Sequence, residues 1–300
     1  MKHAYLFIAT VLMFLLCTQA EENGNGLEPK EQVVNLTVSM DFNYTQIPLF
    51  EEQDATRAAT SATDAGVNRI SFSIFDKDDN AVYEATQLSS DTDFGTFKKY
   101  LAPGTYTLVA VATTVSGTEI GCPSITSPTL ATLSERPKSA VYSATQKEVT
   151  IDNTSSKSVT MEMRYQKTAI FQLVTQDVVP TEVAKVNMEF RTGNTGQSTF
   201  TIDPSTGLDP NAGNFTISSD VTVGNSVNLA AYVLLSSTEE TINIKITALD
   251  KDNNILYSRE KEDVSFQQAY LTKATGTLFS NIGATLSFEK GYIDIKNIDL

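Results

Sequence analysis

Histidine is the residue whose scarcity says most about this sequence. The only one is His3, in an N-terminal segment that we expect to be removed, so the mature chain would carry no imidazole. This excludes Ser-His and Cys-His nucleophilic catalysis, and also zinc or iron sites built on histidine ligands. The two cysteines, Cys17 and Cys122, do not form a metal-binding pair. Only carboxylate, lysine or tyrosine chemistry would remain, as with paired carboxylates in a cleft. We expect no metal, no cofactor and no enzymatic activity.

Tryptophan is absent and positive charge is scarce. Without tryptophan, the case for a platform on which sugar rings stack is thin. The chain has 22 Lys and Arg against 36 Asp and Glu, which gives a formal net charge of −14. An acidic chain repels the phosphate backbone, so we expect no nucleic-acid partner.

What is present indicates an all-β protein. A length of 300 residues allows about two domains. Hydrophobic residues make up 41% of the chain and charged residues 19%, which is typical of globular domains and not of a disordered chain. Short runs of alternating polar and apolar residues, rich in Val, Thr and Ser, recur throughout and favour β-strands.

The N-terminus is typical of a secreted protein. Met1 to His3 form a short basic region, and the apolar run at 4–16 is too short to span a bilayer but suits a signal peptide at 1–16. Two cleavage sites compete. In one, Cys17 becomes a diacylated N-terminal cysteine, and residues 17–30 form a polar tether that holds the protein at a membrane surface. In the other, cleavage after Ala20 leaves Glu21 as the first residue.

One stretch near the N-terminus, Glu31 to Ala65, predicts the function. Its first part alternates strictly and predicts a half-buried strand, followed by a long polar tether that contains Arg57. The apolar side chains of the strand share one face: Val34, Leu36, Val38 and Met40. A strand on an exposed and cleavable tether points to assembly and not to catalysis.

The rest of the first domain, 31–165, reads as further strands and turns. We expect a hairpin around Asp76 to Asn80, which lacks the Gly and the acidic residue that a calcium loop needs at its sixth and twelfth positions. The segment 93–101 is expected to be helical or irregular, 105–113 a central strand, and 114–140 a loop in which Cys122 is an unpaired, half-buried thiol. Met161 and Met163 alternate as core residues.

The second domain, 166–300, is also expected to consist of strands and turns. Strands are expected at 169–174, 186–190 and 242–248 and near Phe200 and Phe215, and 227–235 is expected to be a central strand. The hairpin at 249–257 repeats the one at 75–83 with an offset of 174 residues. This repeat favours two related sandwich domains over one large barrel.

Several segments together resemble the fimbrillin superfamily of Bacteroidales, which includes the major fimbrillins and the minor-fimbrium anchor proteins of type V pili. The match runs over most of the mature chain and rests on these segments: the lipoprotein-like leader, the strand at 33–40, TRAAT (56–60), VNRISFSIFDKDDNAVY (67–83), LAPGTYTLVAVAT (101–113), MEMRYQKTAIFQL (161–173) and GTLF (276–279).

The resemblance implies a fold and a mechanism. The fold is two tandem transthyretin-like β-sandwich domains. In fimbrillins, a lipoprotein precursor reaches the outer membrane and an arginine-specific protease cuts after the first strand, which matches the Arg57–Ala58 bond here. A donor strand of the next subunit then fills the groove left by Val34, Leu36, Val38 and Met40. The implied partners are other fimbrial subunits, the outer membrane through a lipid on Cys17, and a host or bacterial surface ligand.

Two other interpretations stay open. In the first, the chain keeps its first strand, as anchor subunits do, and is an anchor or accessory subunit. Alternatively, it is a monomeric cell-surface lipoprotein that binds glycan or host protein through its loops, with Tyr44, Phe50 and Phe94 as candidate contact residues.

Overall fold

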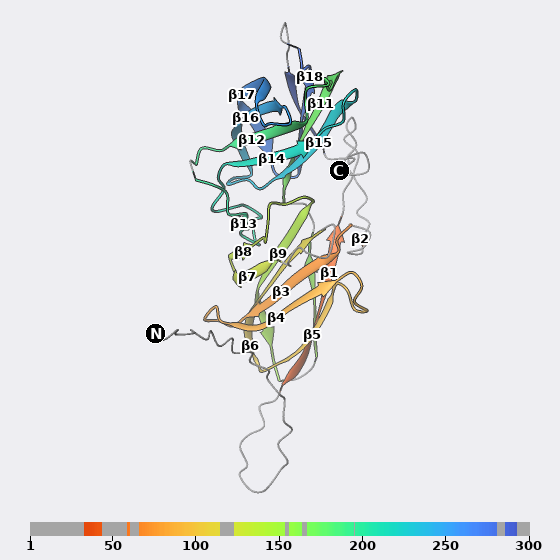
Figure 1. Ribbon diagram of the computed structural model, residues 1–300. Helices are drawn as coiled ribbons and strands as arrows, with labels where there is room; N and C mark the ends of the chain where they lie inside the picture. The colour runs from red at the N-terminus through yellow and green to blue at the C-terminus, as the bar shows by residue number, and fades with distance from the viewer. Residues whose placement is uncertain are drawn as a thin grey trace, which may run out of the picture. The chain divides into compact units, whose positions relative to one another are not determined.

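The structure is a computed structural model that describes residues 33–43, 59–60, 66–114, 123–153, 156–163, 167–194, 196–280 and 286–292 (Figure 1). All regular elements in these ranges are strands. The structure is therefore all-β over the described residues, as the alternating sequence predicts.

The first half of the chain forms a β-sandwich. One antiparallel sheet has the order β4-β3-β6-β9, built from β3 (Arg69–Phe75), β4 (Ala81–Leu88), β6 (Gly104–Thr113) and β9 (Val141–Ile151). The facing sheet sets β1 (Val34–Asn43) between β5 (Thr96–Leu101) and β10 (Lys157–Glu162), and β2 (Ala59–Thr60) pairs with the end of β1. Buried side chains of both sheets form one hydrophobic core.

The second half forms another β-sandwich. Its first sheet has the order β14-β12-β16-β17, from β12 (Lys185–Arg191), β14 (Phe215–Asp220), β16 (Glu239–Leu249) and β17 (Ile255–Gln267). Its second sheet has the order β15-β11-β18-β19, from β11 (Ala169–Val178), β15 (Ser226–Val233), β18 (Tyr270–Gly276) and β19 (Leu286–Tyr292). The core between them contains Phe171, Phe190 and Phe266.

The two sandwiches share one topology. Without the two-residue β2, the main strands of the first sandwich are, in chain order, β1, β3, β4, β5, β6, β9 and β10, and those of the second up to the seventh are β11, β12, β14, β15, β16, β17 and β18. In each, the third strand pairs with the second, the second with the fifth and the fifth with the sixth. The first strand lies between the fourth and the seventh. The first strand runs parallel to the seventh in both, as β1 with β10 and β11 with β18. This confirms the predicted fold class of two tandem β-sandwiches. The sandwiches differ in their eighth strand: β19 pairs with β18 in the second, whereas the two-residue β2 pairs with the end of β1 in the first.

The hairpin repeat has the same turn chemistry at two different places in this topology. Asp76 Oδ1 accepts hydrogen bonds from the N–H groups of Asp78 and Asn80, and Asp250 Oδ1 is bonded in the same way by the residues at 252 and 254. However, the first turn joins the second and third strands of its sandwich, whereas the second joins the fifth and sixth. The repeat is therefore one of turn chemistry, and its offset does not align equivalent strands.

A small third sheet covers the outer face of β4-β3-β6-β9. Its order is β13-β8-β7, from β7 (Ser124–Ser127), β8 (Leu130–Thr132) and β13 (Thr201–Ile202). Ile125 and Ile202 pack in one buried cluster with side chains of the covered sheet, including Phe75. Because both faces of the covered sheet are buried, β3 is buried along its whole length. The predicted domain limits, 31–165 and 166–300, stay predictions, since β13 of the second half pairs with β8 of the first.

Three local expectations are wrong. The segment 93–101 contains the strand β5, and the expected loop at 114–140 contains β7 and β8. The strand β15 is an edge strand of its sheet and not a central one. The residues 231–235, at the end of β15 and just after it, are buried on both faces, because Tyr232 joins the core of the first sandwich and Leu234 joins the cluster under the third sheet.

Candidate functional site

The first strand is hydrogen-bonded on both of its edges. It pairs antiparallel with β5 over Val34 to Ser39 and parallel with β10 over Leu36 to Asp41. The N–H of Met40 extends this connection by donating to the carbonyl of Gly95 over 2.8 Å. The strand that the sequence singles out is therefore the central strand of its sheet, and its removal would leave two strand edges without a neighbour.

The structure brings the four predicted side chains together in the core. The exposed fractions of Val34, Leu36, Val38 and Met40 are 8%, 0%, 1% and 9%. All four belong to the core of the first sandwich, in which Phe97 of β5 stacks on Phe72 with ring centroids 4.7 Å apart. The side chains on the opposite face of β1, from Asn35 to Ser39, are half-buried. One face of β1 is thus an integral part of the hydrophobic core.

The other predicted site residues lie mostly outside the described residues. This holds for the lipidation site Cys17, for the cleavage site Arg57 and Ala58, for Cys122 and for two of the aromatic candidates, Tyr44 and Phe50. The third aromatic candidate, Phe94, is half-buried and packs against the core of the first sandwich. It is therefore a core-flanking residue and not an open contact surface, which corrects its predicted role.

The titratable side chains of the described residues include one fully buried carboxylate, Asp209. Within them, no group of three His, Cys, Asp or Glu side chains could hold a metal ion. Asp209 is fully buried, but its Oδ1 accepts from Thr201 Oγ1 over 2.5 Å and from the N–H of Asn211 over 2.8 Å. Burial raises the pKa of Asp209, and the hydrogen bond from Thr201 offsets part of that rise. This carboxylate supports the turn that follows β13.

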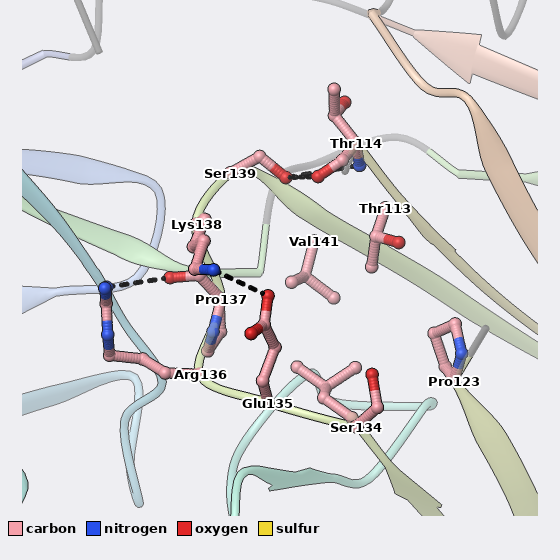
Figure 2. A pocket seen from close by; sticks show the side chains of 11 residues that line it. Thr113, Thr114, Pro123, Ser134, Glu135, Arg136, Pro137, Lys138, Ser139 and Val141 are labelled. Atoms are coloured by element: carbon pink, nitrogen blue, oxygen red, sulfur yellow. Dashed lines mark hydrogen bonds and ion pairs between the residues drawn. The ribbon is translucent and has the colours of Figure 1, made fainter. Parts of the chain in front are cut away.

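Cavities in the described structure differ widely in size. The cavity in Figure 2, which the segment 133–139 borders, has a volume of about 30 Å³ and would hold about one water molecule. A larger cleft of about 430 Å³ lies on the other side of Arg136, against β14 and β15. Sequence reasoning missed it, because its lining residues are far apart in the chain and no motif marks them.

No helix in the described ranges is long and apolar enough to cross a membrane.

Comparisons with known proteins agree with this architecture. The profile of the family described as Fimbrillin-A associated anchor proteins Mfa1 and Mfa2 matches residues 27–296. No curated protein matches the chain. A solved candidate polysaccharide-binding protein from Bacteroides thetaiotaomicron has a TM-score of 0.52 at 12% identity, over 88% of this chain and 99% of that one. A candidate adhesin from the same species has a TM-score of 0.51 at 12% identity, over 90% and 100% of the two chains. The fimbrial anchor protein Mfa2 from Porphyromonas gingivalis aligns with a TM-score of 0.46 at 12% identity, over 87% and 97%.

Proposed function

The chain belongs to the family of fimbrillin-A associated anchor proteins Mfa1 and Mfa2, and from this premise we propose that it joins other fimbrial subunits by β-strand exchange at the position of β1. It is a fimbrial subunit of the cell surface, with a structural or adhesive role. The finer proposal is that it is exported as a lipoprotein, held at the outer membrane through Cys17, and that it works without catalysis.

The observation that carries the proposal is the central place of β1 between β5 and β10. Strands in a sheet lie about 4.8 Å apart, so loss of β1 would open a slot about 10 Å wide between the two remaining edges. A donor strand in this slot would run antiparallel to β5 and parallel to β10. It would pair with main-chain groups on both edges and bury alternate apolar side chains.

The side chains of β1 set the scale of the driving force. Leu36 and Val38 are almost fully buried, and Val34 and Met40 nearly so. At about 1.5–3 kcal/mol for each such side chain, the groove would return roughly 6–12 kcal/mol to a donor that fills all four positions, before the cost of ordering it. A subunit with an empty groove would therefore bind a suitable strand strongly.

The Arg57–Ala58 bond is the proposed switch between two states of the chain. Cleavage there would separate β1 from the rest of the chain and free the groove for a neighbouring subunit. An uncleaved chain would keep β1, stay attached through Cys17, and act as an anchor or accessory subunit. The family description names anchor proteins and so supports the anchor role of an uncleaved chain.

The test is the intact mass and N-terminal sequence of the protein recovered from native cell surfaces, for the wild type and for Arg57→Lys. An arginine-specific protease would leave the wild type starting at Ala58 and would leave the variant uncut. The exposed turn variant Lys77→Gln, which changes a cation elsewhere, is the control and should be cut like the wild type.

A wild-type chain that starts at a diacylated Cys17 and retains residues 18–57 would rule out strand removal and leave the anchor position. A chain that starts at Glu21 would contradict the lipid anchor itself.

A further inference from the structure

The cleft of about 430 Å³ lies where the segment at 133–139 approaches the edge strands β14 and β15. Its volume falls within the range of about 300–1,000 Å³ that small-ligand sites occupy. None of its lining residues belongs to β1 or to the strands that flank β1, although Tyr232 also packs in the core of the first sandwich. Ligand binding in the cleft is therefore a different activity from strand exchange.

The cleft is positively charged in an otherwise acidic chain. Arg136 and Lys138 line it, and no carboxylate does. Lys138 is paired with Glu135, with 3.1 Å between Nζ and Oε1. Arg136 points away from Glu135 (Figure 2), and its Nη1 donates to the carbonyl of Pro137 over 3.1 Å.

The guanidinium of Arg136 has no carboxylate partner among the described residues. Burial lowers the pKa of Arg136, and the nearby Glu135 partly offsets this. An arginine keeps its charge in proteins, so this is a partly buried positive charge whose remaining donors lack an acceptor. Such a fork of N–H donors fits a carboxylate by two parallel hydrogen bonds.

Tyr232 adds an independent sign of a ligand. Its side chain is 97% buried, since only 3% is exposed, and it lines the cleft. Within the described residues its hydroxyl makes no hydrogen bond, and burial raises the pKa of Tyr232 to about 12. Buried tyrosine hydroxyls normally find a partner. Tyr232 therefore brings an unused hydrogen-bonding group to the wall of the cleft.

The remaining polar lining consists of short hydroxyl and amide side chains. Ser218 and Ser219 come from β14, and Asn228 comes from β15. The Oδ1 of Asn228 accepts from Gln172 Nε2 over 2.9 Å, which leaves its amide N–H groups to donate. A set of hydroxyl and amide groups around one cation is suited to the ring hydroxyls and the carboxylate of a sugar acid. A peptide would instead need apolar anchor pockets, and only three of the lining residues are apolar: Ile217, Leu229 and Ala230.

We propose that this cleft binds an acidic sugar, with the carboxylate on Arg136 and the ring hydroxyls on Tyr232, Asn228 and the serines of β14. The chain would then have an adhesive site for surface polysaccharides that contain uronic or similar acids. This goes beyond assembly, because no residue of the site belongs to β1 or to the strands that flank it.

Calorimetric titration of the purified full chain tests the proposal. The probes are a hyaluronan tetrasaccharide and the same tetrasaccharide with its carboxylates reduced to alcohols. We expect the acidic form to bind at least ten-fold more tightly than the reduced form. Arg136→Gln should weaken binding by ten-fold or more, and Tyr232→Phe by several-fold. Lys251→Gln removes a cation from an exposed turn outside the cleft and should leave binding unchanged.

Far-UV circular dichroism of each variant verifies that it is folded, and Arg136→Lys serves where Arg136→Gln does not fold. Several results would overturn the proposal. They are equal binding by Arg136→Gln and Lys251→Gln, equal binding of the acidic and reduced sugars, or no binding at millimolar concentration. Binding of a poly-Asp peptide through Arg136, without binding of the sugar, would replace the sugar by a protein partner.

Discussion

Truncation of Leu36 should be among the most damaging changes in the first sandwich. Its side chain is fully buried at the centre of β1, with core residues of both sheets around it. Leucine-to-alanine changes at such sites cost about 2–5 kcal/mol, from lost burial and from the cavity that remains. We expect Leu36→Ala to fall in the upper half of this range. Because β1 is paired on both edges, its backbone cannot easily move inward to fill the space.

The measurement is urea unfolding followed by far-UV circular dichroism, since the chain has no tryptophan for a fluorescence signal. Thr37→Ala is the matched control. Thr37 neighbours Leu36 in the same strand but faces outward and is half-buried, so it reports the strand propensity without the core. It should cost no more than about 1 kcal/mol. Hydrogen exchange of the β1 amides should speed up in Leu36→Ala and not in Thr37→Ala.

Equal effects of the two substitutions would refute the reasoning. They would mean that β1 contributes its main chain but not its side chains to the stability of the sandwich. The groove would then lack the hydrophobic driving force that strand exchange requires.

Three further predictions concern other parts of the chain. Gly207→Ala should destabilise the protein by about 1–3 kcal/mol in thermal unfolding, because Gly207 has a φ of 77° and a Cβ there would overlap the side chain of Lys167. Gly193→Ala is its control. A Cβ at Gly193 meets open space, so this change should alter the free energy of unfolding by no more than about 1 kcal/mol. Asp177→Ala should cost about 1–3 kcal/mol, since its carboxylate accepts from the N–H groups of Leu278 and Phe279, and the exposed Asp220→Ala is its control. Burial raises the pKa of Asp209 above its ordinary 3.8, so the folded state binds a proton more tightly than the unfolded state. The folded state therefore loses stability as the pH rises through that raised pKa. The melting temperature of Asp209→Asn minus that of the wild type should rise with pH, and a difference that is constant or falls would contradict this.

The sequence predicts those elements whose burial is one-sided or complete over a long run. Strict alternation identifies β1 and its buried face, and a continuous apolar run identifies β6 as central. The missed strand β5 carries Lys98, Lys99 and Tyr100, whose long polar side chains hide the alternation of Phe97 and Leu101. In the structure, the ammonium of Lys99 lies 5.0 Å from the ring centroid of Tyr83, so a lysine occupies a core-facing position.

What depends on contacts between distant segments could not be predicted. The third sheet uses strands of two to four residues, and β13 meets β8 across about 70 residues of chain. The run at 227–235 is apolar because it lies where the two sandwiches meet. Burial by these tertiary contacts produces the same sequence pattern as burial in a central strand. For the same reason no local pattern links Arg136 with Tyr232.

The parallel pairing of the first and seventh strands bears on how the subunit carries tension. In the first sandwich, β1 and β10 run side by side in the same direction, and β11 and β18 repeat this in the second. When the start of one such strand and the end of the other are pulled apart, the hydrogen bonds between them are loaded in shear and must fail together. In an antiparallel hairpin pulled from its open end, they would fail one by one. In a filament assembled by the proposed strand exchange at β1, such parallel pairs would carry the drag of flowing liquid in shear.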